Sequence, residues 1–250
     1  MPDPDLRIYD TLAVAARAIA DQIVQISERA VDTRGRFTIA LSGGETPRIL
    51  YRLLANEEYA SRIDFTTWQV FFGDERCVPP EDADSNYHMA RLAFLDQVPI
   101  PLGNIHRIHG EIEPELAAKA YEDLLRDFFT RRGDKRPRFD LVLLGMGADG
   151  HTAGLFPGTV ALDERERLVV ANHVPQLDTT RLTFTYPLIN AARRVMILVS
   201  GESKAATLRD VLAGPQDPAQ FPVQGVNLRK GNLTWLVDGA AYALVDQSPA

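Results

Sequence analysis

The stretch FDLVLLGMGADGHTAGLFPG, from Phe139 to Gly158, decides the fold. Its first half contains the apolar run Leu141–Leu144, which is typical of a strand buried on both faces of a parallel sheet. Its second half is rich in glycine, and Asp149 and His151 lie two residues apart in that permissive backbone. Because ligands bind beyond the carboxyl ends of the strands in open α/β sheets, we expect the functional site at this loop.

Segments of strand length alternate with helical patterns on both sides of this stretch. We expect helices over residues 10–31, 47–55, 84–95, 114–130, 187–191, 201–212 and 239–244, and strands over residues 36–41, 67–72, 141–144, 168–171, 181–186, 195–199 and 233–237. The alternation predicts an α/β fold, a doubly wound and mostly parallel sheet with helices on both faces. With 250 residues, of which 45% are hydrophobic, we expect a single domain spanning residues 1–250.

Composition narrows the class of partner. The net charge is −7, from 27 basic and 34 acidic residues, and no basic run exceeds two residues, which argues against a nucleic-acid surface or a membrane anchor. Cys77 is the only cysteine, so no internal disulfide can form. The first residues lack the apolar core of a signal peptide, and no run approaches the roughly 20 apolar residues of a membrane span. We expect a cytoplasmic protein that is a monomer or a small homo-oligomer.

A second glycine loop follows the strand expected over residues 36–41. Ser42, Gly43 and Gly44 lead into a helix, with Pro47 expected at its first position. Free backbone N–H groups and the helix dipole attract phosphate there, and the glycines allow it to come close. The alternative is a tight turn capped by Thr46 that binds no ligand. A nucleoside-triphosphate loop is excluded, because the Gly-Lys-Ser/Thr sequence is missing.

Two cations are candidates for holding an anion near these loops. Arg76 belongs to a charged group that follows the strand expected over residues 67–72. Lys204 falls in the first turn of an expected helix, where a cation opposes the helix dipole unless an anion lies nearby. A solvated loop and an exposed helical lysine remain the plain alternatives.

His151 is the best candidate for proton transfer. An imidazole titrates near neutral pH, and Asp149 could orient it. The loop also matches the dinucleotide fingerprint literally, but residues 151–157 are a poor helix start and no acidic residue ends the next strand, so nicotinamide binding is disfavoured. A nucleophilic-serine elbow is missing.

The remaining histidines do not indicate a metal site. His88, His106 and His109 complete no ligand set, and neither HExxH nor paired-cysteine spacing is present. We therefore interpret all three as structural residues and predict no metal.

Five ordered motifs resemble those of the 6-phosphogluconolactonases. They read LSGGETP from Leu41, FGDERCVP from Phe72 with SNY from Ser85, GMGADGHTA from Gly145 with LFP from Leu155, RLT from Arg181, and GESKA from Gly201. The related glucosamine-6-phosphate deaminases and isomerases share the Ser-Gly-Gly and Gly-x-Asp-Gly-His elements. They differ around the second strand, where Asp-Glu-Arg with Ser-Asn-Tyr favours the lactonase.

The resemblance implies a sugar-phosphate substrate, hydrolysis of 6-phospho-D-glucono-1,5-lactone, and no cofactor. It makes His151 the general base that activates water, with Asp149 close by. It puts the phosphate at residues 42–44 with Arg76 and Lys204, and it makes Arg181 a contact to the phosphate or to the developing charge on the carbonyl oxygen. A deaminase or isomerase and a non-catalytic sugar-phosphate sensor are the alternatives.

Overall fold

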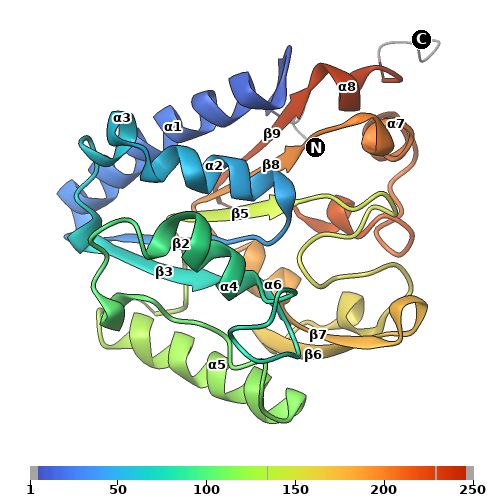
Figure 1. The fold of residues 1–250 in the computed structure, drawn as a ribbon. Coiled ribbons are helices and arrows are strands. Elements are labelled where there is room, and N and C mark those ends of the chain that lie inside the picture. Colours follow the sequence, from blue (N-terminus) through green and yellow to red (C-terminus); the bar gives the residue numbers. More distant parts are fainter. Residues whose placement is uncertain (1–4, 134, 229, 246–250) are drawn as a thin grey trace.

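A six-stranded parallel sheet forms the centre of the protein. The computed structural model describes residues 5–133, 135–228 and 230–245, and its main sheet has the strand order β1-β9-β8-β5-β2-β3 (Figure 1). The strands are β1 (Asp5–Tyr9), β2 (Phe37–Leu41), β3 (Trp68–Phe72), β5 (Leu141–Gly145), β8 (Arg194–Val199) and β9 (Asn232–Asp238). The predicted α/β class and mostly parallel sheet are confirmed.

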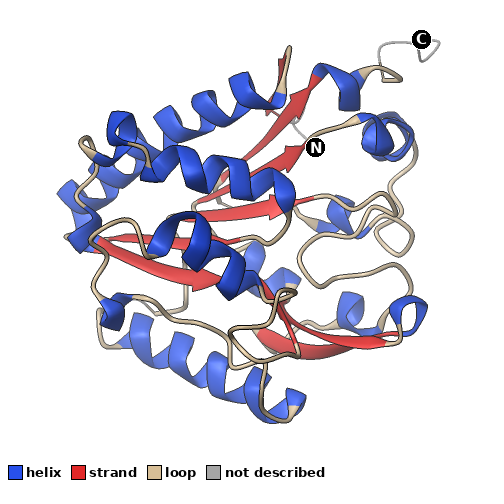
Figure 2. Cartoon of the chain, viewed as in Figure 1, coloured by secondary structure: helices blue, strands red, loops and turns tan. Residues whose placement is uncertain are grey.

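Helices flank the sheet (Figure 2). They are α1 (Leu12–Arg34), α2 (Glu45–Ala55), α3 (Glu57–Ala60), α4 (Asn86–Ala90), α5 (Pro114–Thr130), α6 (Tyr186–Ile189), α7 (Ala205–Ala213) and α8 (Gly239–Tyr242). α1 packs beside α2 and against β2 and β9, because most of its apolar residues recur at helical spacing and lie buried on one face, although Val14 is exposed. Among the described residues, no helix is long and apolar enough to cross a membrane.

A second, antiparallel sheet was not predicted. It has the order β4-β7-β6, with β4 over Asp74–Arg76, β6 over Val169–Val174 and β7 over Thr179–Phe184. The sequence predicted strands near β6 and β7 but could not show that they leave the main sheet and pair with residues 74–76. α5 packs against β6 and β7 of this small sheet, and Figure 1 shows the small sheet below the main sheet.

Other differences lie at element ends and in two short elements that were not predicted, β1 and α3. α2 begins at Glu45, so Pro47 is its third residue; the N–H that proline lacks has no intrahelical partner at that position anyway. Lys204 ends a 3₁₀ turn, Glu202–Lys204, and α7 starts after it. β1 was missed because its sequence is short and charged and its side chains are largely exposed at the sheet edge.

A buried carboxylate ties the start of β5 to its neighbours. Asp140 has a side chain only 3% exposed, and its Oδ2 accepts hydrogen bonds from the backbone N and the Oγ1 of Thr38, both at 2.9 Å. Its Oδ1 lies 2.7 Å from Arg34 of α1 and 3.3 Å from Arg193. These contacts join β2, the start of β5 and α1 at the edge of the sheet opposite the two glycine loops.

We expect Asp140→Asn to lower the free energy of unfolding by about 3 kcal/mol, because breaking one side of a buried ion pair leaves uncompensated charge. Urea denaturation measures this. The matched control is Asp123→Asn, whose exposed pair with Lys119 should contribute less than about 0.5 kcal/mol. Equal effects of the two substitutions would contradict the role given to Asp140.

Candidate active site

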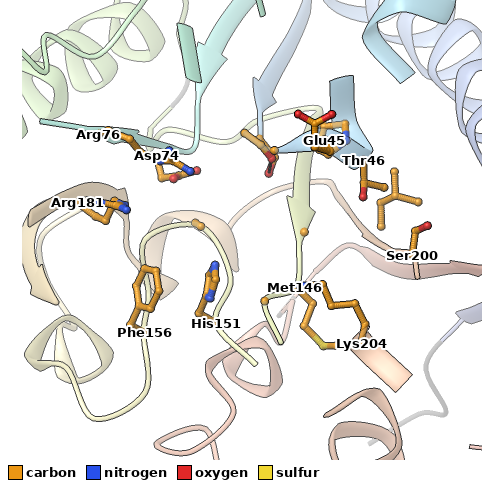
Figure 3. Close-up of a pocket in the computed structure, with 18 of the residues that line it drawn as sticks. Glu45, Thr46, Asp74, Arg76, Met146, His151, Phe156, Arg181, Ser200 and Lys204 are labelled. Carbon is orange, nitrogen blue, oxygen red and sulfur yellow. Dashed lines mark hydrogen bonds between the residues drawn. The ribbon is translucent and has the colours of Figure 1, made fainter. Parts of the chain in front are cut away.

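The predicted site residues meet in one cavity of about 420 Å³. Its lining includes seven of the eight residues selected from the sequence: Ser42, Gly43, Gly44, Arg76, His151, Arg181 and Lys204. The eighth, Asp149, stands behind His151. Figure 3 shows His151 on one wall, Arg76 and Arg181 together on one side, and Lys204 on the other side.

The loop after β5 is folded by its own backbone. Gly147 N donates to His151 O at 2.8 Å, and Thr152 Oγ1 donates to Gly145 O at 2.8 Å. A Cβ on residue 147 would lie 2.1 Å from His151 Nδ1 and 2.4 Å from Asp149 Oδ1, so this glycine makes room for the pair. No helix starts directly after Gly150, which agrees with rejecting the dinucleotide fingerprint.

The geometry of the loop determines which imidazole nitrogen is free. His151 Nδ1 lies 2.6 Å from Asp149 Oδ1, which also accepts the His151 backbone N–H at 3.1 Å. Partial burial disfavours the Asp149 carboxylate, but the hydrogen bonds from His151 outweigh it, and the pKa of Asp149 lies below its ordinary value. Because an ionised carboxylate can only accept, Nδ1 carries the proton and Nε2 is left as the acceptor.

An aromatic ring covers one face of the imidazole. Phe156 stacks on His151 with ring centroids 4.1 Å apart and an interplanar angle of 20°. The stack and the bond to Asp149 together restrain both torsions of the His151 side chain, which is 32% exposed. A neutral imidazole held in this way can take a proton from a ligand or from water in the cavity.

The Ser42–Gly44 turn opens at the start of α2, and no side chain caps that helix among the described residues. Ser42 N is already used, because it donates to Tyr51 Oη at 2.9 Å. The Ser42 hydroxyl makes only a long hydrogen bond to Gly43 O, at 3.3 Å, which it can exchange for one to a ligand. Gly44 has φ 99°, and a Cβ on Gly43 would lie 1.9 Å from Asn86 Oδ1. Because no described side chain caps α2, its first N–H groups stay available to an anion. The cap by Thr46, considered from the sequence as the alternative, is not formed among the described residues.

Arg76 and Arg181 lie directly opposite each other where β4 pairs with β7. Burial, and then the proximity of Arg76, lowers the pKa of Arg181. Asp74 is buried beside them; burial raises the pKa of this carboxyl, against the opposing effects of Arg76, Asn86 and His151. Like charges face to face destabilise a sheet, so this pair favours binding of an anion between or above the guanidinium groups.

Lys204 approaches from the other side of the cavity, beside Met146 and Ser200 (Figure 3). Among the described residues it has no ion-pair partner. The 3₁₀ turn ending at Lys204 follows β8, so the ammonium group lies at the carboxyl edge of the main sheet. Its position agrees with that of an anion contact.

Asp74 and Glu75 belong to the charged group that the sequence indicated as a site fragment, but only Arg76 of that group was chosen as a candidate; Asp74 lines the cavity and Glu75 supports it. Glu75 is 2% exposed, and its carboxylate accepts Asn86 N at 2.7 Å, Tyr87 N at 2.9 Å and Ser85 Oγ at 3.1 Å. This clamps the start of α4 onto β4. The signal was present, since Asp-Glu-Arg and Ser-Asn-Tyr occur together among the motifs, but their pairing could not be read from the chain.

Two further histidines and the cysteine lie outside this cavity. His106 stacks on Phe71 with ring centroids 4.4 Å apart, and burial followed by the charge of Arg132 lowers its pKa to about 4. His109 pairs with Glu111. Burial raises the pKa of the Cys77 thiol, which makes it a poor nucleophile. No cluster of His, Cys, Asp or Glu suited to a metal occurs in the described ranges.

Comparisons with known proteins agree with the motifs. Residues 10–235 match the family described as glucosamine-6-phosphate isomerases/6-phosphogluconolactonase. A protein from Synechocystis sp. named 6-phosphogluconolactonase is 47% identical over 96% of this chain and 97% of its own length. A protein of the same name from Nostoc sp. is 43% identical over 94% of this chain and 95% of its own length.

Solved structures match over nearly the whole chain. The 6-phosphogluconolactonase from Trypanosoma brucei superposes with a TM-score of 0.83 at 29% identity, covering 97% of this chain and 99% of that one. A monomeric glucosamine-6-phosphate deaminase matches with a TM-score of 0.80 at 22% identity, covering 96% of this chain and 99% of that one, which is a likeness of fold alone. The chain belongs to the glucosamine-6-phosphate isomerase/6-phosphogluconolactonase family.

Proposed function

We propose that this protein hydrolyses 6-phospho-D-glucono-1,5-lactone to 6-phosphogluconate, the second step of the oxidative pentose phosphate pathway. One observation carries the proposal: a single cavity combines a carboxylate-oriented imidazole with a helix start and several cations suited to a phosphate. Two relatives named 6-phosphogluconolactonase, 43% and 47% identical over nearly full length, support the same activity.

In the proposed mechanism His151 is the general base. Its Nε2 accepts a proton from water as the water oxygen attacks the lactone carbonyl carbon. The bond from Nδ1–H to Asp149 keeps the required tautomer and stabilises the imidazolium that forms. The tetrahedral oxyanion then collapses by breaking the bond between the carbonyl carbon and the ring oxygen, and that oxygen takes up a proton.

The 6-phosphate binds to the turn formed by Ser42, Gly43 and Gly44, together with Arg76 and Lys204. The free N–H groups at the start of α2 and the charge of the two cations support this assignment. Arg181 contacts either the phosphate or the oxyanion, since its guanidinium faces the same cavity beside Arg76.

Several further features complete the proposal. Residues 1–250 act as a single domain without a cofactor, and the small-molecule substrate is the partner. The acidic net charge supports a protein that binds neither nucleic acid nor an anionic membrane. We place the protein in the cytoplasm as a monomer or small homo-oligomer.

A coupled assay tests the activity. The protein should accelerate decay of the phosphorylated lactone above its spontaneous rate, with 6-phosphogluconate measured by a coupled dehydrogenase. Ammonia release from glucosamine 6-phosphate would instead identify a deaminase. Binding of 6-phosphogluconate without any acceleration would identify a sensor, and either result would overturn the proposal.

Substituting His151 should separate chemistry from binding. We expect His151→Ala to lower kcat by roughly 10²–10⁴-fold, the contribution of a general base, while 6-phosphogluconate binds nearly as well as to the parent in calorimetry. The parent kcat should fall at acidic pH as the imidazole takes up a proton, and the variant should lose this dependence. Asp149 should stay ionised while the imidazole takes up its proton, because the pKa of this carboxyl lies below its ordinary value.

The matched control is His109→Ala, since His109 is an exposed histidine outside the cavity. It should keep the parental kcat and pH profile. If His151→Ala keeps either the parental kcat or the same acidic limb, the base is another group.

The phosphate contacts predict a difference between two substrates. Arg76→Ala and Lys204→Ala should each raise KM for the phosphorylated lactone by roughly 10-fold or more, because a hydrogen bond to a charged group contributes about 1.5–3 kcal/mol. Hydrolysis of unphosphorylated glucono-1,5-lactone should be slow in the parent and little changed in the variants. Lys119→Ala, on the outer face of α5, serves as control. Equal losses with both lactones would show that the two cations act elsewhere.

A further inference from the structure

A second cavity of about 390 Å³ lies beside the first, between the first turns of α2 and the helix that starts at Asn86. Three arginines and one histidine contribute to its lining: Arg48, Arg52, Arg76 and His88. Arg48 and Arg52 are one helical turn apart on α2, so they share one face of that helix. Nothing in the mechanism uses Arg48, Arg52 or His88.

Three buried nitrogen atoms of these side chains have no hydrogen-bond partner among the described residues. Arg48 Nε, Arg76 Nε and His88 Nδ1 are buried, and none has a hydrogen-bond partner within the described ranges. Arg52 is exposed and makes no ion pair there. Leaving buried polar groups unpaired is costly, so these nitrogens, which lie within the wall of one cavity, make the wall a place where a bound polar group would be stabilising.

The acidic residues of the lining do not neutralise these cations. Glu45 pairs with Arg48, but its side chain is 76% exposed, and such a surface pair is weak. Asp84 is exposed, and its backbone oxygen, rather than its carboxylate, accepts Arg76 Nη1 at 3.0 Å. The lining itself thus carries three guanidinium groups and two solvated carboxylates, and the buried Asp74 of the first cavity lies beside Arg76, which leaves Arg52 as the cation without an acidic neighbour among the described lining residues.

We propose that this second cavity binds a phosphate dianion, free or as a monoester, separately from the substrate. Guanidinium groups bind phosphate oxygens through paired N–H donors, which matches the three arginines. Arg76 lines both cavities, as do Gly44 and Glu45. An anion in the second cavity would therefore contact a cation that the substrate phosphate in the first cavity also contacts. Occupancy should therefore weaken binding of the substrate phosphate, and by linkage the substrate should weaken the second anion equally.

The test uses enzyme saturated with 6-phosphogluconate, so that the first cavity is filled. Calorimetric titration with inorganic phosphate, at ionic strength held constant with sodium chloride, should show one further equivalent per chain. The Arg52→Gln/His88→Gln double variant should bind that equivalent at least about 10-fold more weakly and keep the parental kcat, since both residues lie outside the first cavity. A parallel titration with glycerol phosphate distinguishes a monoester site from one that takes free phosphate only.

Lys204→Gln is the matched control, because Lys204 lines the first cavity alone. It should weaken 6-phosphogluconate and leave the additional phosphate equivalent unchanged. No phosphate binding to saturated enzyme, or the same binding in the double variant, would overturn the proposal. If 6-phosphogluconate itself fails to bind, the proposed function fails separately, and phosphate titration of the free enzyme still tests the dependence on Arg52 and His88.

Discussion

Parallel pairing of the strands is the constraint on which the site depends. The registers of β2 with β3 and of β5 with β8 join Leu41 to Phe72 and Gly145 to Leu198. Because parallel strands end at the same edge, the segments that follow all leave the sheet together. The Ser42–Gly44 turn, the loop that carries His151 and the turn that carries Lys204 reach one cavity for this reason.

Two glycines and one buried carboxylate fix the positions of side chains at the cavity. Gly147 lacks the Cβ that would displace the His151–Asp149 pair, and Gly43 lacks the one that would strike Asn86. Glu75 holds Asn86 in place through the backbone at the start of α4. This buried carboxylate also accepts hydrogen bonds from Ser85 and Tyr87, so it fastens the start of α4 to β4 at several points.

The small antiparallel sheet brings two arginines to the cavity at directly opposite positions of neighbouring strands. It places Arg76 opposite Arg181 and buries Asp74 beside them, so that two like charges face each other across the strands and one buried carboxyl interacts electrostatically with both. Such conflicts between local stability and charge are expected at functional sites. The cations of α2 extend the same positive region into the neighbouring cavity.

The sequence alone determined the α/β class and the two glycine loops, because apolar periodicity, glycine and helix starts are local signals. These signals also selected most residues that meet in the cavity, and the resemblance of the motifs added Arg181. The sequence also indicated Asp149 as the partner of His151, since two residues of one tight loop are constrained to lie close. Only the tertiary structure decided that Arg76 opposes Arg181, that Glu75 clamps α4 and that a second cationic cavity adjoins the first. Those contacts join segments distant in the chain, and their free energy depends on burial and strand pairing, which no local pattern encodes.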